Sequence, residues 1–103
     1  MKKKVFIDDR ADKELKEFTS EVQNDFKTII AILEDTGRLD FPDARKITND
    51  IFEMRVMHGG IYRSFYAYIR QDCVIILHFF QKKQQKLPLK HIKLAQKRLN
   101  EYV

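Results

Sequence analysis

The stretch from Ile51 to Pro88 reads IFEMRVMHGGIYRSFYAYIRQDCVIILHFFQKKQQKLP, and it decides the fold. It contains three runs rich in β-branched and aromatic residues, which is the composition of β-strands. Gly59-Gly60 separates the first two runs and Gln71-Asp72 the second two, and such short connections favour hairpins. The sequence therefore predicts a three-stranded antiparallel meander formed by Ile51–Val56, Ile61–Ile69 and Cys73–Phe80. The third run is apolar at almost every position, which predicts burial on both faces.

The rest of the chain supplies a short edge strand and helices around this meander. Lys3–Ile7 can form the edge strand, and apolar residues at spacings of three and four predict helices near Ala11–Phe18 and Glu21–Asp35, with Gly37 as the stop. Arg38–Asp50 contains Pro42 and shows no period, so it is expected to be a loop. Pro88 is suited to begin a final helix. We expect one α+β domain over residues 1–103, with a small antiparallel sheet (meander plus N-terminal edge strand) packed against two N-terminal helices and a C-terminal helix.

Composition narrows the functional classes. A single cysteine, Cys73, excludes an internal disulfide framework, and His58, His78 and His91 are too far apart for common metal-ligand spacings, so no metal or other cofactor is expected. The sequence has no apolar run of about 20 residues and no signal peptide, which favours a cytoplasmic protein without membrane contact. The net charge is +5, and residues 81–100 hold seven Lys or Arg and no acid. A basic surface of this kind attracts nucleic acid, although these lysines can equally be the solvated face of a helix.

Cations interrupt the predicted strands. Arg55 and Arg63 lie inside runs that favour burial, the only acid within the strands is Glu53, and three lysines follow the last strand, at Lys82, Lys83 and Lys86. A five-residue connection from Met57 to Ile61 would place Arg55 directly opposite Arg63, where like charges repel. Only Glu53 or an anion between them would make that arrangement tolerable. An external anion such as a phosphate chain would satisfy so many cations.

Cations of this kind can assist cleavage of RNA by its own 2′-hydroxyl, since the reaction needs a stabilised phosphorane charge and a proton carrier. A lysine serves as proton carrier when neighbouring cations lower its pKa, and His78 or His58 could serve instead. Arg45 and Lys46 could flank a bound phosphate chain. Each of these residues also has a structural alternative. Arg63 can pair with Glu53, His78 can lie in the core, His58 can belong to a turn, and the other cations can be solvated at the surface. Tyr62, Tyr66 and Tyr68 could stack on bases, or they can pack under the helices.

The order FEMR, a glycine-containing turn, IYRSFY, VIILHFFQKKQQKLP and a final helix ending KLAQKRLNEY resembles the RelE/ParE toxin superfamily. The HigB-type, phage-Gp49-like branch is the most similar. This resemblance covers nearly the whole chain and implies a RelE-like fold. It also implies a type II toxin that cuts mRNA in the ribosome without a metal, and a partner helix-turn-helix (HigA-like) antitoxin. Operator DNA would be bound only through the antitoxin complex.

The resemblance also assigns roles to residues. It places the phosphate-stabilising arginine on Arg63, a second arginine on Arg55, and the basic residue after the last strand on Lys82 or Lys83; Arg45, Lys46, Lys86, His58 and His78 are the expected RNA contacts. The chain departs from the RelE branch at Ile51 and Glu53, where that branch has paired lysines. It also has no counterpart of that branch's C-terminal tyrosine near Lys86–Leu89, although Tyr102 follows further on. Two alternatives remain open within the superfamily: a ParE-like toxin that inhibits DNA gyrase, and an inactive RNA-binding member.

Overall fold

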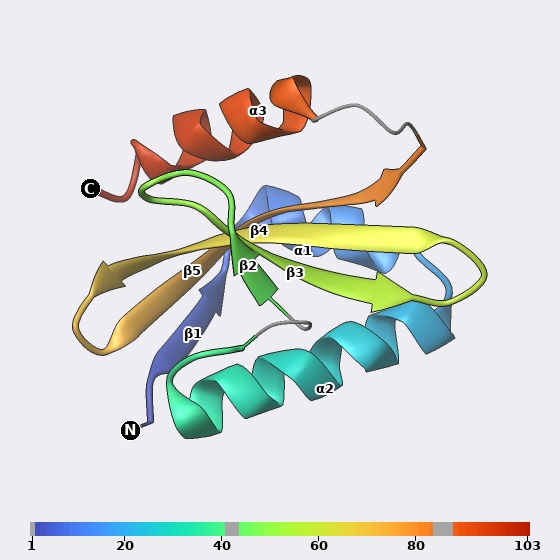
Figure 1. Ribbon diagram of the computed structural model, residues 1–103, viewed down its shortest axis with the longest axis horizontal. Coiled ribbons are helices and arrows are strands. Elements are labelled where there is room, and N and C mark those ends of the chain that lie inside the picture. The colour runs from blue at the N-terminus through green and yellow to red at the C-terminus, as the bar shows by residue number, and fades with distance from the viewer. Residues whose placement is uncertain (1, 41–43, 84–87) are drawn as a thin grey trace.

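The computed structural model describes residues 2–40, 44–83 and 88–103. In these ranges the chain forms five strands and three helices, in the order β1 (Lys4–Ile7), α1 (Asp9–Lys16), α2 (Ser20–Thr36), β2 (Ala44–Lys46), β3 (Phe52–Met57), β4 (Ile61–Arg70), β5 (Cys73–Lys82) and α3 (Leu89–Leu99). The strands form one sheet with the order β1-β5-β4-β3-β2. As Figure 1 shows, α1 and α2 lie on one side of the sheet and α3 on the other. The predicted α+β fold is confirmed.

The meander is present where the sequence predicts it, with β3, β4 and β5 paired antiparallel in succession. β5 is buried from Cys73 to Phe80. It lies between β1 and β4 in the sheet. Apolar residues from its two faces belong to two separate core clusters, one with α1 and α2 and the other with α3, so helices cover the strand on both faces. The expected burial of this strand on both faces is therefore confirmed.

Two details of the sheet correct the prediction. β1 is the expected edge strand, but it pairs with β5 in parallel, so the sheet is mixed rather than wholly antiparallel. β1 and β5 are separated in the chain by two helices and the other strands. A hairpin would force two strands to pair antiparallel, but no hairpin joins β1 to β5, so they are free to pair in parallel. The predicted loop 38–50 contains the short strand β2. Its sequence, ARK, has little strand propensity, and pairing with β3 stabilises the strand. Pro42 lies outside the described residues.

The helices begin and end where local chemistry favours it. The Asp8 side chain accepts hydrogen bonds from the backbone N–H groups of Arg10 and Ala11 at the start of α1. α2 ends at Gly37, which has a φ of 82°, a left-handed conformation that favours glycine, as predicted. Among the described residues, no helix is both long enough and apolar enough to cross a membrane.

Candidate functional site

Arginines from three strands gather on the sheet face that carries α3. The register pairs Arg55 with Arg63 across β3 and β4, and Arg45 with Glu53 across β2 and β3. Residues directly opposite each other in a sheet share a face, and so do residues two apart on one strand. Arg45, Glu53, Arg55 and Arg63 are therefore on the same face. Met57 and Ile61 pair as the last position of the two strands, so the turn is residues 58–60, and Arg55 lies opposite Arg63, the arrangement that the sequence left conditional on the turn.

Glu53 lies beneath these arginines and ion-pairs with all three. Its carboxylate oxygens lie 3.0 Å from Arg63 Nη1, 3.1 Å from Arg45 Nε and 3.5 Å from Arg55 Nε. In the described part of the chain, no other carboxylate comes within ion-pair distance of these guanidinium groups. The Glu53 side chain is only 1% exposed. One buried carboxylate thus reduces the repulsion within a cross-strand pair of like charges.

The three arginines differ in their access to solvent. The side chains of Arg45 and Arg55 are 43% and 32% exposed, whereas that of Arg63 is 3% exposed. Arg63 thus takes the alternative arrangement, paired to Glu53, and its Nε has no hydrogen-bond partner among the described residues. Burial lowers the pKa of Arg63, and Arg45 and Arg55 lower it further, while the charge of Glu53 opposes them. Arg45 and Arg55 are therefore the arginines that an external anion can reach.

Lys82 extends the positive surface at the end of β5. It is opposite Ile61, two residues along β4 from Arg63, and so lies on the same face. Desolvation lowers the pKa of Lys82, and the charges of Arg63, Arg55 and Arg45 lower it further, against the opposing effect of Glu53. This is the environment that the sequence predicts for a proton-carrying lysine. Lys83 is exposed beyond the end of β5, and Lys86 lies outside the described residues.

We call Arg45, Arg55, Arg63 and Lys82 the cation cluster. It sets three guanidinium groups around one carboxylate, with Lys82 further along the same face, which leaves an excess of three positive charges there. An excess of positive charge that is partly exposed favours the binding of an anion. The negative charge of the anion reduces the repulsion among the cations that Glu53 alone does not neutralise. Guanidinium groups suit phosphate in particular, since they donate two parallel hydrogen bonds.

Other predicted contacts lie away from the cation cluster. Lys46 is opposite Phe52, which packs in the core under α2, so Lys46 belongs to the other face of the sheet. His58, in the turn after β3, lies 3.7 Å from Glu21 and 3.8 Å from Asp25 of α2. Tyr62, Tyr66 and Tyr68 pack in the same core as α1 and α2, in agreement with their structural alternative.

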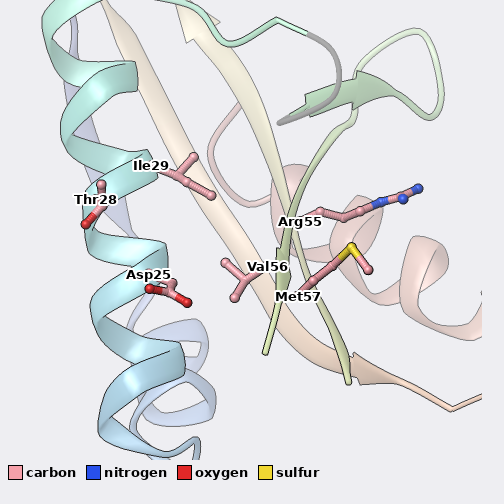
Figure 2. Close-up of a pocket in the computed structure, with 6 residues that line it drawn as sticks. All are labelled: Asp25, Thr28, Ile29, Arg55, Val56 and Met57. Carbon is pink, nitrogen blue, oxygen red and sulfur yellow. The ribbon is translucent and has the colours of Figure 1, made fainter. Parts of the chain in front are cut away.

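A shallow pocket of about 280 Å³ lies where the outer end of β3 meets α2. Figure 2 shows that Val56 points towards Ile29 of α2, whereas Arg55 and Met57 point away from this helix. The pocket is lined by Asp25, Thr28, Ile29, Arg55, Val56 and Met57. Arg55 therefore belongs to both the rim of this pocket and the cation cluster on the opposite face.

His78 belongs to a buried network that ties α1, β5 and α3 together. Its Nδ1 lies 2.9 Å from Glu14 Oε1 and its Nε2 lies 2.7 Å from His91 Nδ1, and its side chain is 6% exposed. Arg98 donates hydrogen bonds to both Glu14 oxygens and to the backbone carbonyl of Leu77. The His91 ring also stacks on Phe80, with ring centres 3.9 Å apart. This placement agrees with the core alternative for His78.

The network makes the stability of the fold depend on pH. Burial lowers the pKa of His91, helped by the charges of His78 and Lys90 and opposed by Glu14. Since the unfolded chain binds this proton at about pH 6.5, the free energy of unfolding should fall as pH drops below that value, by at most about 1.4 kcal/mol per pH unit. Urea unfolding of wild type and His91→Gln at pH 7.5 and 5.5 measures the effect. The variant should lose less stability on acidification, and an equal loss would contradict this role.

The C-terminal tyrosine has a structural partner. The Tyr102 hydroxyl donates a hydrogen bond to Asp8 at 2.6 Å, and Arg10 joins Asp8 and Glu101 by ion pairs of 2.7 and 2.9 Å. These contacts anchor the end of the chain to the start of α1. Tyr102 thus has a structural role at the end of the chain.

Comparison with solved structures agrees with this architecture. The free E. coli toxin RelE with two arginine-to-alanine substitutions superposes over 100% of both chains, with a TM-score of 0.69 and 14% sequence identity. The isolated E. coli RelE toxin matches 88% of this chain and 96% of its own, with a TM-score of 0.65 and 18% identity. No curated protein sequence matches the chain. The chain therefore has the fold of RelE, as predicted.

The sequence itself identifies the family within that fold. Residues 13–100 match the model of the family described as phage derived protein Gp49-like. Because the match spans most of the 103 residues, the chain belongs to this Gp49-like family. The matched range contains the four members of the cation cluster.

Proposed function

We propose that this protein is the toxin of a type II toxin–antitoxin pair, of the HigB kind, and that it is a metal-independent, ribosome-dependent mRNA endonuclease. The observation that carries the proposal is the cation cluster, which leaves three positive charges uncompensated on one sheet face. The RelE-like fold and the Gp49-like family support it. The proposed partners are the ribosome with its mRNA and a helix-turn-helix, HigA-like antitoxin. Such a protein acts in the cytoplasm, as one domain.

The proposed reaction uses the 2′-hydroxyl of the RNA as nucleophile. Its oxygen attacks the adjacent phosphorus, the bond from phosphorus to the 5′-oxygen breaks, and a 2′,3′-cyclic phosphate forms. One proton leaves the 2′-hydroxyl and one is delivered to the departing 5′-oxygen. Arg55, with Arg45 beside it, would stabilise the negative charge that develops on the phosphate oxygens.

Lys82 is our candidate for proton transfer, because its lowered pKa brings a neutral amine closer to physiological pH. Arg63 acts in this proposal as a positioning residue, since it is buried and holds the Glu53 carboxylate under the exposed arginines. Lys83 and Lys86 would extend the path of the RNA beyond the end of β5. Lys46, His58 and His78 lie outside the cation cluster and have no role in this step.

Induction of the chain in bacterial cells tests the function and its rival. A ribosome-dependent nuclease should arrest growth, halt translation and leave cut transcripts within minutes. A ParE-like gyrase inhibitor would instead leave transcripts intact and induce a DNA-damage response. That second outcome would reject the nuclease assignment. Co-expression of a helix-turn-helix protein from the neighbouring reading frame should restore growth if the antitoxin assignment is correct.

Salt dependence tests whether the cation cluster contacts phosphates. If Arg45, Arg55 and Lys82 each neutralise one phosphate of a single strand, the logarithm of the binding constant should fall with the logarithm of salt concentration with a slope of about −2. Lys82→Ala should reduce this slope by about 0.7. Fluorescence titrations of a short RNA at several salt concentrations provide the measurement, with Lys27→Ala on α2 as control. An unchanged slope in Lys82→Ala would remove Lys82 from the RNA contact.

A further inference from the structure

Met57 is an unusually exposed apolar residue within a strand. It ends β3, and its side chain is 72% exposed. The register places it opposite Ile61, and Ile61 opposite Lys82, so these three side chains form one row across β3, β4 and β5. Burying Met57 against a partner would remove this apolar surface from water, which is favourable.

This row adjoins the cation cluster. Arg55 lies two residues before Met57 on the same strand, a rise of about 6.8 Å, and both side chains point away from α2 in Figure 2. Lys82 closes the other end of the row. A ligand whose phosphates bind Arg55 and Lys82 would therefore carry its remaining atoms over Met57 and Ile61.

We propose that Met57, with Ile61 beside it, is the contact for one nucleobase of a bound RNA strand; this inference rests on the proposed function. Each nucleotide offers a flat base on a negatively charged backbone, which matches an exposed thioether bordered by cations. The methionine sulfur is polarisable and packs favourably against aromatic rings. Because every base has an aromatic face, such a contact adds affinity without selecting a sequence.

The charge pattern favours a nucleic acid over an acidic peptide for this surface. The cation cluster takes one residue from each of four strands, β2 to β5, so successive anionic groups of the ligand must follow a path across the sheet. A phosphate backbone has its charges at regular intervals, with a base attached to each unit. On the opposite side of β3, His58 faces the acids Glu21 and Asp25, a surface less suited to an anionic strand.

An abasic-RNA titration tests this contact. A short fluorescent single-stranded RNA, and copies of it lacking one base at successive positions, are titrated with wild type, Met57→Ala and Met57→Phe. Met57→Ala should bind the intact RNA about 3- to 10-fold more weakly, as expected for one sulfur–aromatic contact. One abasic RNA should weaken wild-type binding by the same factor, and Met57→Ala should not distinguish it from intact RNA. Met57→Phe should restore affinity.

Two control variants separate the proposed base contact of Met57 from the proposed nuclease function. Ile32→Ala alters a 44% exposed apolar residue of α2, on the other side of the sheet, and should leave binding unchanged. Arg55→Ala should weaken binding to intact and abasic RNA by the same factor. If Met57→Ala binds every RNA as wild type does, the base contact is wrong while the function stands. If wild type binds no RNA at all, even on ribosomes, the proposed function itself is overturned.

Discussion

Arg55→Ala should lower the rate of mRNA cleavage by about 100- to 1,000-fold, the usual cost of removing one donor that stabilises a developing oxyanion. Arg55 is the expected source of this effect because its side chain is partly exposed, whereas Arg63 is buried against Glu53. The protein should remain folded. Arg55 and Arg63 are directly opposed like charges, so removing one relieves repulsion and should leave the free energy of unfolding unchanged or slightly raised.

The matched control is Arg70→Ala, which removes an exposed arginine from the far end of β4, beside the turn to β5. It should cut mRNA at the wild-type rate. Single-turnover cleavage on purified ribosomes, with urea unfolding of each variant, separates catalysis from stability. A folded Arg55→Ala protein with wild-type cleavage would exclude Arg55 from the mechanism.

Glu53→Gln should cost about 3–5 kcal/mol of unfolding free energy, because it removes the negative charge from a buried ion pair and leaves Arg63 uncompensated. Glutamine keeps the shape of the side chain, so the loss reports the charge. Natural domains have total stabilities of about 5–15 kcal/mol, so this single change should remove a large part of the stability. Urea unfolding measures it, with Glu34→Gln on the exposed face of α2 as the control.

A second substitution shows whether the cost comes from Arg63. The double variant Glu53→Gln/Arg63→Met removes both buried charges and should recover most of the lost stability, since replacing a whole buried ion pair is often nearly neutral. Arg45 and Arg55 can turn towards water because they are partly exposed. If Glu53→Gln unfolds at the same urea concentration as Glu34→Gln, Glu53 does not hold the cation cluster together.

The meander and the helices could be predicted because their signals are local. Alternating or continuous apolar runs, Gly59-Gly60 and Gly37 each specify their own neighbourhood of the chain. The opposition of Arg55 and Arg63 depended on the length of one turn, which the sequence alone does not fix. The parallel pairing of β1 and the short strand β2 could not be predicted in this way, since both depend on partners distant in sequence.

The features of the site that the sequence did not predict also depend on contacts between residues distant in the chain. Side-chain burial depends on three-dimensional packing, so the sequence could not decide whether Arg63 would face solvent or Glu53. The network of Glu14, His78, His91 and Arg98 was missed because it joins three elements remote in the chain. One signal was available: Arg98 lies three residues after Ala95, on the stripe of α3 that faces the core. Lys46 could have been excluded from the cation cluster by strand alternation if β2 had been recognised.

In the mechanism that we propose, one shared carboxylate leaves a positive sheet face on which mRNA is cut by its own 2′-hydroxyl. The most direct measurement maps the ends of a labelled mRNA incubated with translating ribosomes and either wild type or Arg55→Ala/Lys82→Ala. With wild type, we expect new upstream fragments that end in a 2′,3′-cyclic phosphate or a 3′-phosphate, and with the double variant we expect intact mRNA. Intact mRNA with folded wild-type protein, or cleavage that leaves a 3′-hydroxyl, would contradict the account.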